Sequence, residues 1–96
     1  MNPLNRAEFS ITTNLNLQNS FGVIDQEDNV KLHVTVVQAD DDYGWFEIYD
    51  LKTGGNDWYA EGSLRINNKE LVDYDGIFDL PFFVKTQLRE WGIKVD

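Results

Sequence analysis

The chain has 96 residues, of which 42% are hydrophobic and 14% aromatic, so it has enough apolar surface for one modest core and disorder is not expected. It carries 17 Asp and Glu against 8 Lys and Arg, a formal net charge of −9, and lacks the basic cluster that direct binding to nucleic acid requires. Without cysteine it forms neither a disulfide nor a thiolate metal site, and we expect residues 1–96 to fold as a single domain.

The N-terminal part has the weakest pattern. Apolar side chains occupy alternate positions from Glu8 to Leu17, with one gap at Thr13, which favours a strand. Because this segment must pack somewhere, we expect residues 1–24 either to cover one face of a sheet or to form a partly flexible arm. Residues 25–29, Asp-Gln-Glu-Asp-Asn, predict a polar turn.

The middle of the chain shows the period of two that is typical of half-buried strands. The clearest case runs from Val30 to Val36, where Val or Leu occupies every second position and Lys, His and Thr lie between. Three further strands are expected, covering Trp45 to Asp50, Trp58 to Ile66 and Glu70 to Tyr74.

Turn-forming residues separate these strands. The run Asp40-Asp41-Asp42 is too charged to pack and predicts a solvated loop, and Gly54-Gly55 suits the tip of a hairpin. Asn67-Asn68 predicts a tight two-residue turn. The order indicates an antiparallel meander of about four to five strands.

A helical pattern replaces the strand pattern after Gly76. Its apolar stripe, at spacings of four, four and three, is Leu80, Val84, Leu88 and Trp91. Asp79 is the expected N-cap with Pro81 in the first turn, and Gly92 should end the helix with Ile93 making the accompanying apolar contact. The predicted class is therefore α+β, a small antiparallel sheet packed against one C-terminal helix.

Catalytic signatures are weak. His33 is the only histidine, no serine lies in a nucleophile elbow, and Gly54-Gly55 lacks the Lys and Ser or Thr of a phosphate loop. A glycosidase-like carboxylate pair would need a substrate groove that about 100 residues rarely enclose. We therefore expect no enzymatic activity, no catalytic residue and no cofactor.

One segment approaches a metal motif. Asp73, Asp75 and Asp79 flank Gly76, and alternate carboxylates before a glycine can converge on a hard cation such as calcium. An EF-hand loop needs a third oxygen ligand before its glycine and a late bidentate Glu, which are missing here. A turn followed by an N-cap is the simpler interpretation, and a calcium-binding or hydrolytic module remains an alternative.

The expected sheet has a second face that mixes aromatic residues with acids. If Phe46 and Ile48 face the helix, the opposite face carries Trp45, Glu47 and Tyr49, and similar alternation from Trp58 to Ile66 adds Tyr59, Glu61 and Arg65. Tyr and Trp are frequent anchors of protein interfaces, and surrounding acids select a basic partner. The competing interpretation is that the N-terminal segment covers this face.

These patterns favour a small acidic, non-catalytic module that binds a basic protein surface, of the kind that nucleic-acid-binding proteins present. Ordinary solubility is the alternative reason for the charge. The residues expected to contact the partner are Asp40, Asp41, Asp42, Trp45, Glu47, Tyr49, Tyr59, Glu61, Asp73 and Asp75. As a class analogy only, the combination resembles the small inhibitors of phages and mobile elements that mimic nucleic acid or block host defence complexes, such as anti-CRISPR proteins.

Localisation and assembly are less constrained. The N-terminal sequence lacks a basic region followed by an apolar run, and no apolar stretch approaches the about 20 residues of a membrane span, so we expect a cytoplasmic protein without membrane contact. A structural or accessory protein that forms a homodimer through a sheet edge or through its aromatic face is the second functional hypothesis.

Overall fold

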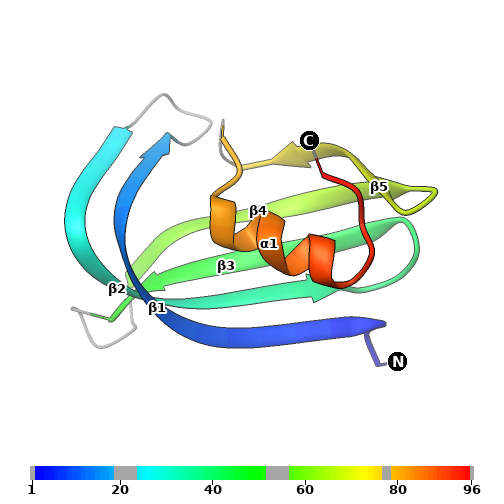
Figure 1. Cartoon of the computed structure of the whole chain (residues 1–96), viewed down its shortest axis with the longest axis horizontal. Helices are drawn as coiled ribbons and strands as arrows, with labels where there is room; N and C mark the ends of the chain where they lie inside the picture. The colour runs from blue at the N-terminus through cyan, green and yellow to red at the C-terminus, as the bar shows by residue number, and fades with distance from the viewer. Residues whose placement is uncertain (1, 19–23, 52–56, 77–78, 96) are drawn as a thin grey trace.

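Five strands form one antiparallel sheet and a helix packs on one of its faces in the computed structural model, which describes residues 2–18, 24–51, 57–76 and 79–95 (Figure 1). The elements are β1 (Asn5–Gln18), β2 (Ile24–Gln38), β3 (Tyr43–Asp50), β4 (Asp57–Asn67), β5 (Glu70–Asp75) and α1 (Phe82–Glu90). The strand order in the sheet follows the chain, β1-β2-β3-β4-β5. The predicted α+β meander with one C-terminal helix is therefore confirmed.

Strand β1 extends the sheet sideways and does not lie across its second face. It pairs with β2 from Asn5 opposite Gln38 to Gln18 opposite Ile24, so the predicted strand from Glu8 to Leu17 is confirmed. The predicted polar turn at residues 25–29 is wrong, because these residues belong to β2. Backbone pairing in a two-stranded ribbon does not require apolar side chains, so composition was a poor guide here.

The β1–β2 ribbon bends where its register shifts. The shift lies between Thr13 and Leu15, and Asn29 opposite it has a φ of 56°. The Asn29 N–H donates to Asn14 Oδ1 at 3.1 Å, which supports the irregular backbone. An extra residue of this kind bends a ribbon and increases its twist. Figure 1 shows the far part of the ribbon curving toward the side of the sheet that carries α1.

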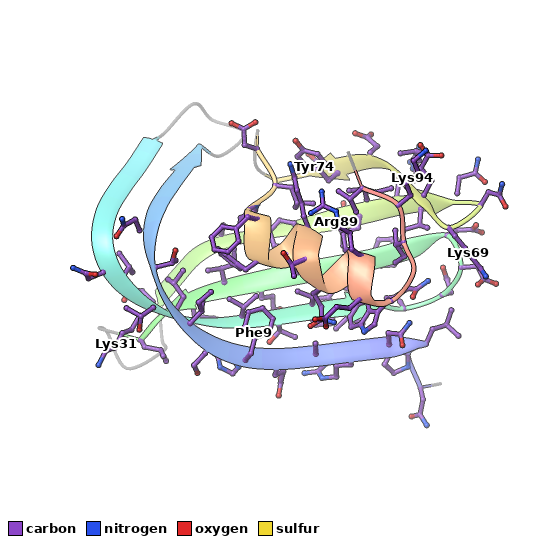
Figure 2. All side chains as sticks on the ribbon, viewed as in Figure 1. Phe9, Lys31, Lys69, Tyr74, Arg89 and Lys94 are labelled. Carbon is purple, nitrogen blue, oxygen red and sulfur yellow. The ribbon has the colours of Figure 1, made fainter. Side chains whose placement is uncertain are left out.

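The core lies between α1 and the sheet. Phe46 and Ile48 are fully buried and face the helix, as their alternation predicts. The buried cluster consists of Val30, Leu32, Val34, Val36, Phe46, Ile48, Leu64, Ile66, Leu80, Phe83, Val84, Leu88 and Ile93. Phe9 of β1 and Tyr74 of β5 pack against this cluster from either side of α1 (Figure 2). Burial of this apolar area is the main force that holds the helix on the sheet.

Helix α1 begins later than the sequence pattern predicts. The N-cap is Pro81, whose carbonyl accepts hydrogen bonds from the N–H groups of Val84 and Lys85 at 3.1 Å, and no side chain caps the helix. Asp79 is therefore not the N-cap. The residue before a proline is disfavoured in the helical region, so Leu80 prevents the helix from starting before Pro81.

The C-terminal end of α1 agrees with the prediction. Gly92 has a φ of 81°, its N–H donates to Arg89 O at 3.0 Å, and the N–H of Ile93 donates to Leu88 O at 3.0 Å. This pair of bonds is a Schellman motif, and the buried Ile93 supplies its apolar contact.

The C-terminal segment after the helix runs beside β5. The Lys94 N–H donates to Lys69 O at 2.8 Å, and its carbonyl accepts from the Leu71 N–H at 2.9 Å, so the start of β5 is covered on its outer side. Lys69 and Lys94 lie at the same end of the molecule in Figure 2.

The sequence predicted the turns that connect β3 to β4 and β4 to β5. The turn between β4 and β5 uses Asn68 and Lys69, with φ values of 52° and 60°, so it lies one residue later than the predicted Asn67-Asn68. The predicted hairpin tip at Gly54-Gly55 lies outside the described residues, although β3 and β4 are antiparallel neighbours as expected. No helix within the described ranges has the length and apolarity needed to cross a membrane.

Candidate functional site

The sheet face opposite α1, hereafter the outer face, carries no packed element within the described ranges. Its residues form rows across the strands, because antiparallel partners on one face lie side by side. One row consists of Arg6, Val37, Trp45, Ser63 and Asp75. The next row consists of Glu8, Thr35, Glu47 and Glu61. The aromatic and acidic residues expected on this face are thus adjacent to one another.

A hollow of about 460 Å³ opens on β3, β4 and the end of β5. Its side-chain walls are Tyr43, Trp45, Glu47, Glu61, Ser63 and Asp75. Ser63 is small and lies between Trp45 and Asp75 in the row, so it leaves space between their longer side chains. The result is a depression with aromatic rings on one side and three carboxylates around it.

A second hollow of about 420 Å³ shares Tyr43, Ser63 and Asp75 with the first. It adds Asp42 from the β2–β3 loop and Asp73 from β5, together with Arg65. Asp73 lies opposite Arg65 in the β4–β5 pairing. Because they share these residues, the two hollows lie next to each other, and we call them together the acidic groove.

Two glycines allow the backbone of β5 to approach β4 at the edge of the groove. A Cβ at Gly62 would collide with the carbonyl oxygen of Asp75 and with the Phe46 ring. Gly76 has a φ of 109°, and a Cβ there would collide with the carbonyl oxygen of Glu61. Only glycine fits this close approach, so these two glycines determine how near β5 lies to β4 at the groove.

Glu47 and Glu61 lie directly opposite each other in the β3–β4 pairing. Neither forms a salt bridge within the described part of the chain, where Arg6 and Glu8 form an ion pair at 2.7 Å. Like charges directly opposite in a sheet destabilise the pairing. The groove therefore holds negative charge that a bound cation would neutralise.

Trp45 already interacts with a cation of its own chain. The guanidinium carbon of Arg6 lies 5.9 Å from the centroid of the Trp45 ring, while Arg6 Nη2 binds Glu8 Oε1. A guanidinium over an aromatic face and beside a carboxylate is a favourable arrangement in a partly hydrated site. The same combination of groups is available in the acidic groove.

Tyr49 continues the outer face beyond Glu47. Its hydroxyl donates to Glu47 Oε2 at 3.2 Å. Partial loss of hydration raises the pKa of Tyr49, and the Glu47 charge, the hydrogen bond to Glu47 and the charge of Glu61 raise it further. His33, in the neighbouring strand, lies opposite Tyr49 and is partly exposed. The lone histidine is thus partly exposed, and although Ser10 lies opposite it in β1, no hydrogen bond joins its ring to a serine or carboxylate in the described part of the chain.

The structure brings together most of the residues expected at the interface. The acidic groove contains Asp42, Trp45, Glu47, Glu61, Asp73 and Asp75. Asp40 and Asp41 are exposed in the adjoining loop but do not line the groove, and Asp40 Oδ1 accepts from the Asp42 N–H at 2.8 Å.

Tyr59 does not fall on the expected register position. A shift between Ile48 and Tyr49 places Trp58, not Tyr59, opposite Tyr49. The extra residue in β4 breaks the alternation on which the Tyr59 prediction depended. The side chain of Tyr59 lies outside the described ones, so its role stays a prediction.

Sequence reasoning missed Tyr43 and Arg6. Tyr43 is 46% exposed and lines both hollows, although it shares the alternation of Trp45 and Glu47 and could have been found from it. Arg6 could not have been found in this way, because its contact with Trp45 depends on how β1 pairs with β2 and how β2 pairs with β3.

No group of three or more His, Cys, Asp or Glu side chains suitable for a metal ion occurs in residues 2–18, 24–51, 57–76 and 79–95. Asp73, Asp75 and Asp79 all lie in these ranges, so they do not converge on one point. The calcium-binding or hydrolytic alternative gains no support from this arrangement.

No family model, curated protein or solved structure matches the chain. The acidic groove is therefore the feature of the molecule that bears on its function.

Proposed function

We propose that this protein is a small, non-catalytic binding module whose acidic groove takes up a basic segment of another protein. The observation that carries the proposal is the unneutralised Glu47–Glu61 pair beside Trp45 on an open sheet face. Carboxylates next to an aromatic ring suit an Arg or Lys side chain better than any neutral group. The net charge of −9 would also attract a basic partner at long range.

The shape of the groove favours a side chain from a partner surface over a free small molecule. It is open, shallow and lined by charge, whereas small-molecule sites are mostly enclosed and apolar. Arg6 on Trp45 provides an internal example of a guanidinium held by this face. An Arg from the partner would occupy the opposite side of the same ring, between Trp45 and the carboxylates.

A partner surface that normally binds nucleic acid fits this charge pattern. Opposed residues on neighbouring strands lie about 5 Å apart, and duplex DNA carries one charge per about 3.4 Å along each strand, so the two spacings are of the same order. The proposal implies that this protein inhibits such a partner by occupying the partner's basic surface. A cytoplasmic setting, or an origin in a phage, is part of the same proposal.

Titration calorimetry with an arginine-rich peptide tests the proposal. The wild-type protein should bind the peptide, and affinity should fall at least about tenfold between about 0.05 and 0.5 M salt because screening weakens exposed charge pairs. The Glu47→Gln, Glu61→Gln variant should lose about tenfold in affinity at low salt.

A matched variant separates the groove from overall charge. Asp79→Asn with Glu90→Gln removes the same two charges from exposed positions outside the groove, which are near the ends of α1. This variant should bind nearly as the wild type does. Equal losses in both variants, or binding that ignores salt, would contradict a specific role for the groove.

A competition measurement tests the class of partner. A basic DNA-binding domain with a labelled duplex should release the duplex as this protein is added, and the Glu47→Gln, Glu61→Gln variant should release less. Arginine-peptide binding without any such competition would limit the proposal to basic segments that do not contact nucleic acid.

A further inference from the structure

The two edges of the sheet are protected to different degrees. Strand β5 is six residues long, carries Glu70, Asp73 and Asp75, and is covered at its start by the segment around Lys94. Strand β1 is 14 residues long and has β2 on one side with no strand on the other in the described part of the chain. Exposed edges present unpaired backbone groups that can accept another strand.

The sequence of β1 lacks the devices that usually block edge pairing. It has no proline and no lysine, its charges are Arg6 and Glu8, and these neutralise each other in the 2.7 Å ion pair. Residues 9–18 carry no charge. From Asn5 to Thr13 the pairing with β2 has no register shift, so this half of the edge is regular.

Apolar side chains lie along the same edge on the helix side. Phe9 and Ile11 pack against the core but remain only partly buried, because no neighbouring strand adjoins them beyond β1 in the part that the structure describes. Figure 2 shows Phe9 beside α1 at the open side of the sheet. A strand added to β1 would bring further side chains against both residues.

We propose that the occupant of this edge is β1 of a second copy of the chain. Each copy carries −9 overall, so two copies repel each other least where the surface lacks excess negative charge, and β1 is such a surface. A basic foreign segment would be drawn to the acidic groove instead, and an acidic one would be repelled. The result is a continuous ten-stranded sheet with a two-fold axis, the commonest symmetry of homodimers.

An antiparallel register centred on Ser10 satisfies the side chains. It places Phe9 opposite Ile11 of the second copy and Glu8 opposite Thr12 of the second copy, so apolar residues meet on the helix side and no like charges meet on the outer face. The acidic grooves of both copies stay open, because they lie on β3 to β5.

Sedimentation velocity over about 1 μM to 1 mM protein tests this dimer. The mass should rise toward twice the 11.1 kDa of one chain, and the rise should persist or strengthen at high salt, because screening reduces repulsion between copies. This salt dependence is opposite to that expected for the arginine-rich peptide. A monomer at every concentration would overturn the proposal.

Two single substitutions locate the interface. Ser10→Lys places two ammonium groups opposite each other at the axis and should abolish the dimer, whereas Thr86→Lys on the exposed side of α1 changes the net charge equally and should not. Both sites are exposed, and urea denaturation confirms that the variants fold. A dimer that survives Ser10→Lys would overturn the proposed edge.

Cross-linking tests the register directly, since the chain contains no cysteine. Ser10→Cys should form an intermolecular disulfide under mild oxidation, because residues opposite each other at the axis bring their Cβ atoms within bonding reach. Thr86→Cys should remain mostly monomeric under the same conditions. Equal cross-linking in both variants would indicate random collision and reject the register. Loss of the dimer in Ser10→Lys with retained peptide binding separates this inference from the proposed function.

Discussion

Glu47 on β3 and Glu61 on β4 face each other directly across the sheet, on the outer face and without a salt bridge in the described part of the chain. A sheet under selection for stability alone would place opposite charges or a polar pair there. Retaining two carboxylates at one cross-strand position costs folding free energy that a cationic ligand would return on binding. Stability and binding should therefore respond in opposite directions to changes at this pair.

Glu61→Lys should stabilise the fold and weaken binding. The new ammonium would lie opposite Glu47, and conversion of a like-charged pair into an opposite pair should raise the free energy of unfolding by about 0.2–1 kcal/mol. Urea denaturation measures this gain, and calorimetry with the arginine-rich peptide should show a loss of affinity. Asp41→Lys changes net charge equally in an exposed loop, so it separates general relief of repulsion from the cross-strand effect. A destabilised Glu61→Lys protein would contradict the prediction.

Tyr49 should make the protein sensitive to alkaline pH. Lost hydration, then the Glu47 and Glu61 carboxylates, raise its pKa in the folded state. A raised folded pKa contributes stability that is fully present below the ordinary tyrosine value of about 10 and is lost as pH rises through the folded value. Unfolding free energy measured by urea should therefore fall above about pH 10.

Two variants isolate this contribution. Tyr49→Phe should show a smaller fall than the wild type, and Glu47→Gln should lower the pKa of Tyr49, because it removes the acceptor carboxylate at 3.2 Å. Ultraviolet titration detects tyrosinate, and the difference between wild type and Tyr49→Phe assigns the signal among the four tyrosines. An unchanged titration in Glu47→Gln would reject the assigned cause.

The regular elements were predictable because their patterns are local. Alternation from Val30 to Val36 predicts which side chains of β2 face the helix, and Gly92 ends α1 through a backbone conformation that few other residues adopt. Asp79 failed as the N-cap because the restriction imposed by Pro81 outweighs the capping preference of an aspartate.

The site was predictable only in part. Alternation places Trp45 and Glu47 on one face, but their junction with Asp42 and Asp73 depends on strand register and on shifts in β4 that leave no local signature. The register position of Tyr59 could not be predicted for the same reason: one extra residue in a strand reverses the alternation beyond it, and Trp58 instead lies opposite Tyr49. The groove is therefore defined by the register of the strand pairing, which the composition of the sequence does not reveal.

Gly62→Ala should distort the acidic groove. The added Cβ would meet the Asp75 carbonyl oxygen and the Phe46 ring, so the end of β5 must move, at a cost of about 1–3 kcal/mol of stability. Peptide binding should weaken with it, since Asp75 lines the groove. Gly92→Ala is the comparison, because its Cβ meets open space and the cost of about 1–2 kcal/mol comes from the positive φ alone. The Gly92→Ala variant should bind as the wild type does. If affinity falls in proportion to stability in both variants, the loss in Gly62→Ala does not come from the groove.

Trp45→Ala should weaken binding of the arginine-rich peptide by about tenfold, because it removes the aromatic wall on which a guanidinium would stack. Trp45→Phe keeps a ring with a weaker cation–π attraction and should lose less. Both variants also lose or weaken the contact with Arg6, so urea denaturation is needed to separate stability from affinity. Trp91→Phe provides the control, since Trp91 packs on the helix side of the sheet, away from the groove. The expected order of affinity is wild type and Trp91→Phe first, then Trp45→Phe, then Trp45→Ala, and a Trp45→Ala protein that binds like the wild type would show that the partner does not use this ring.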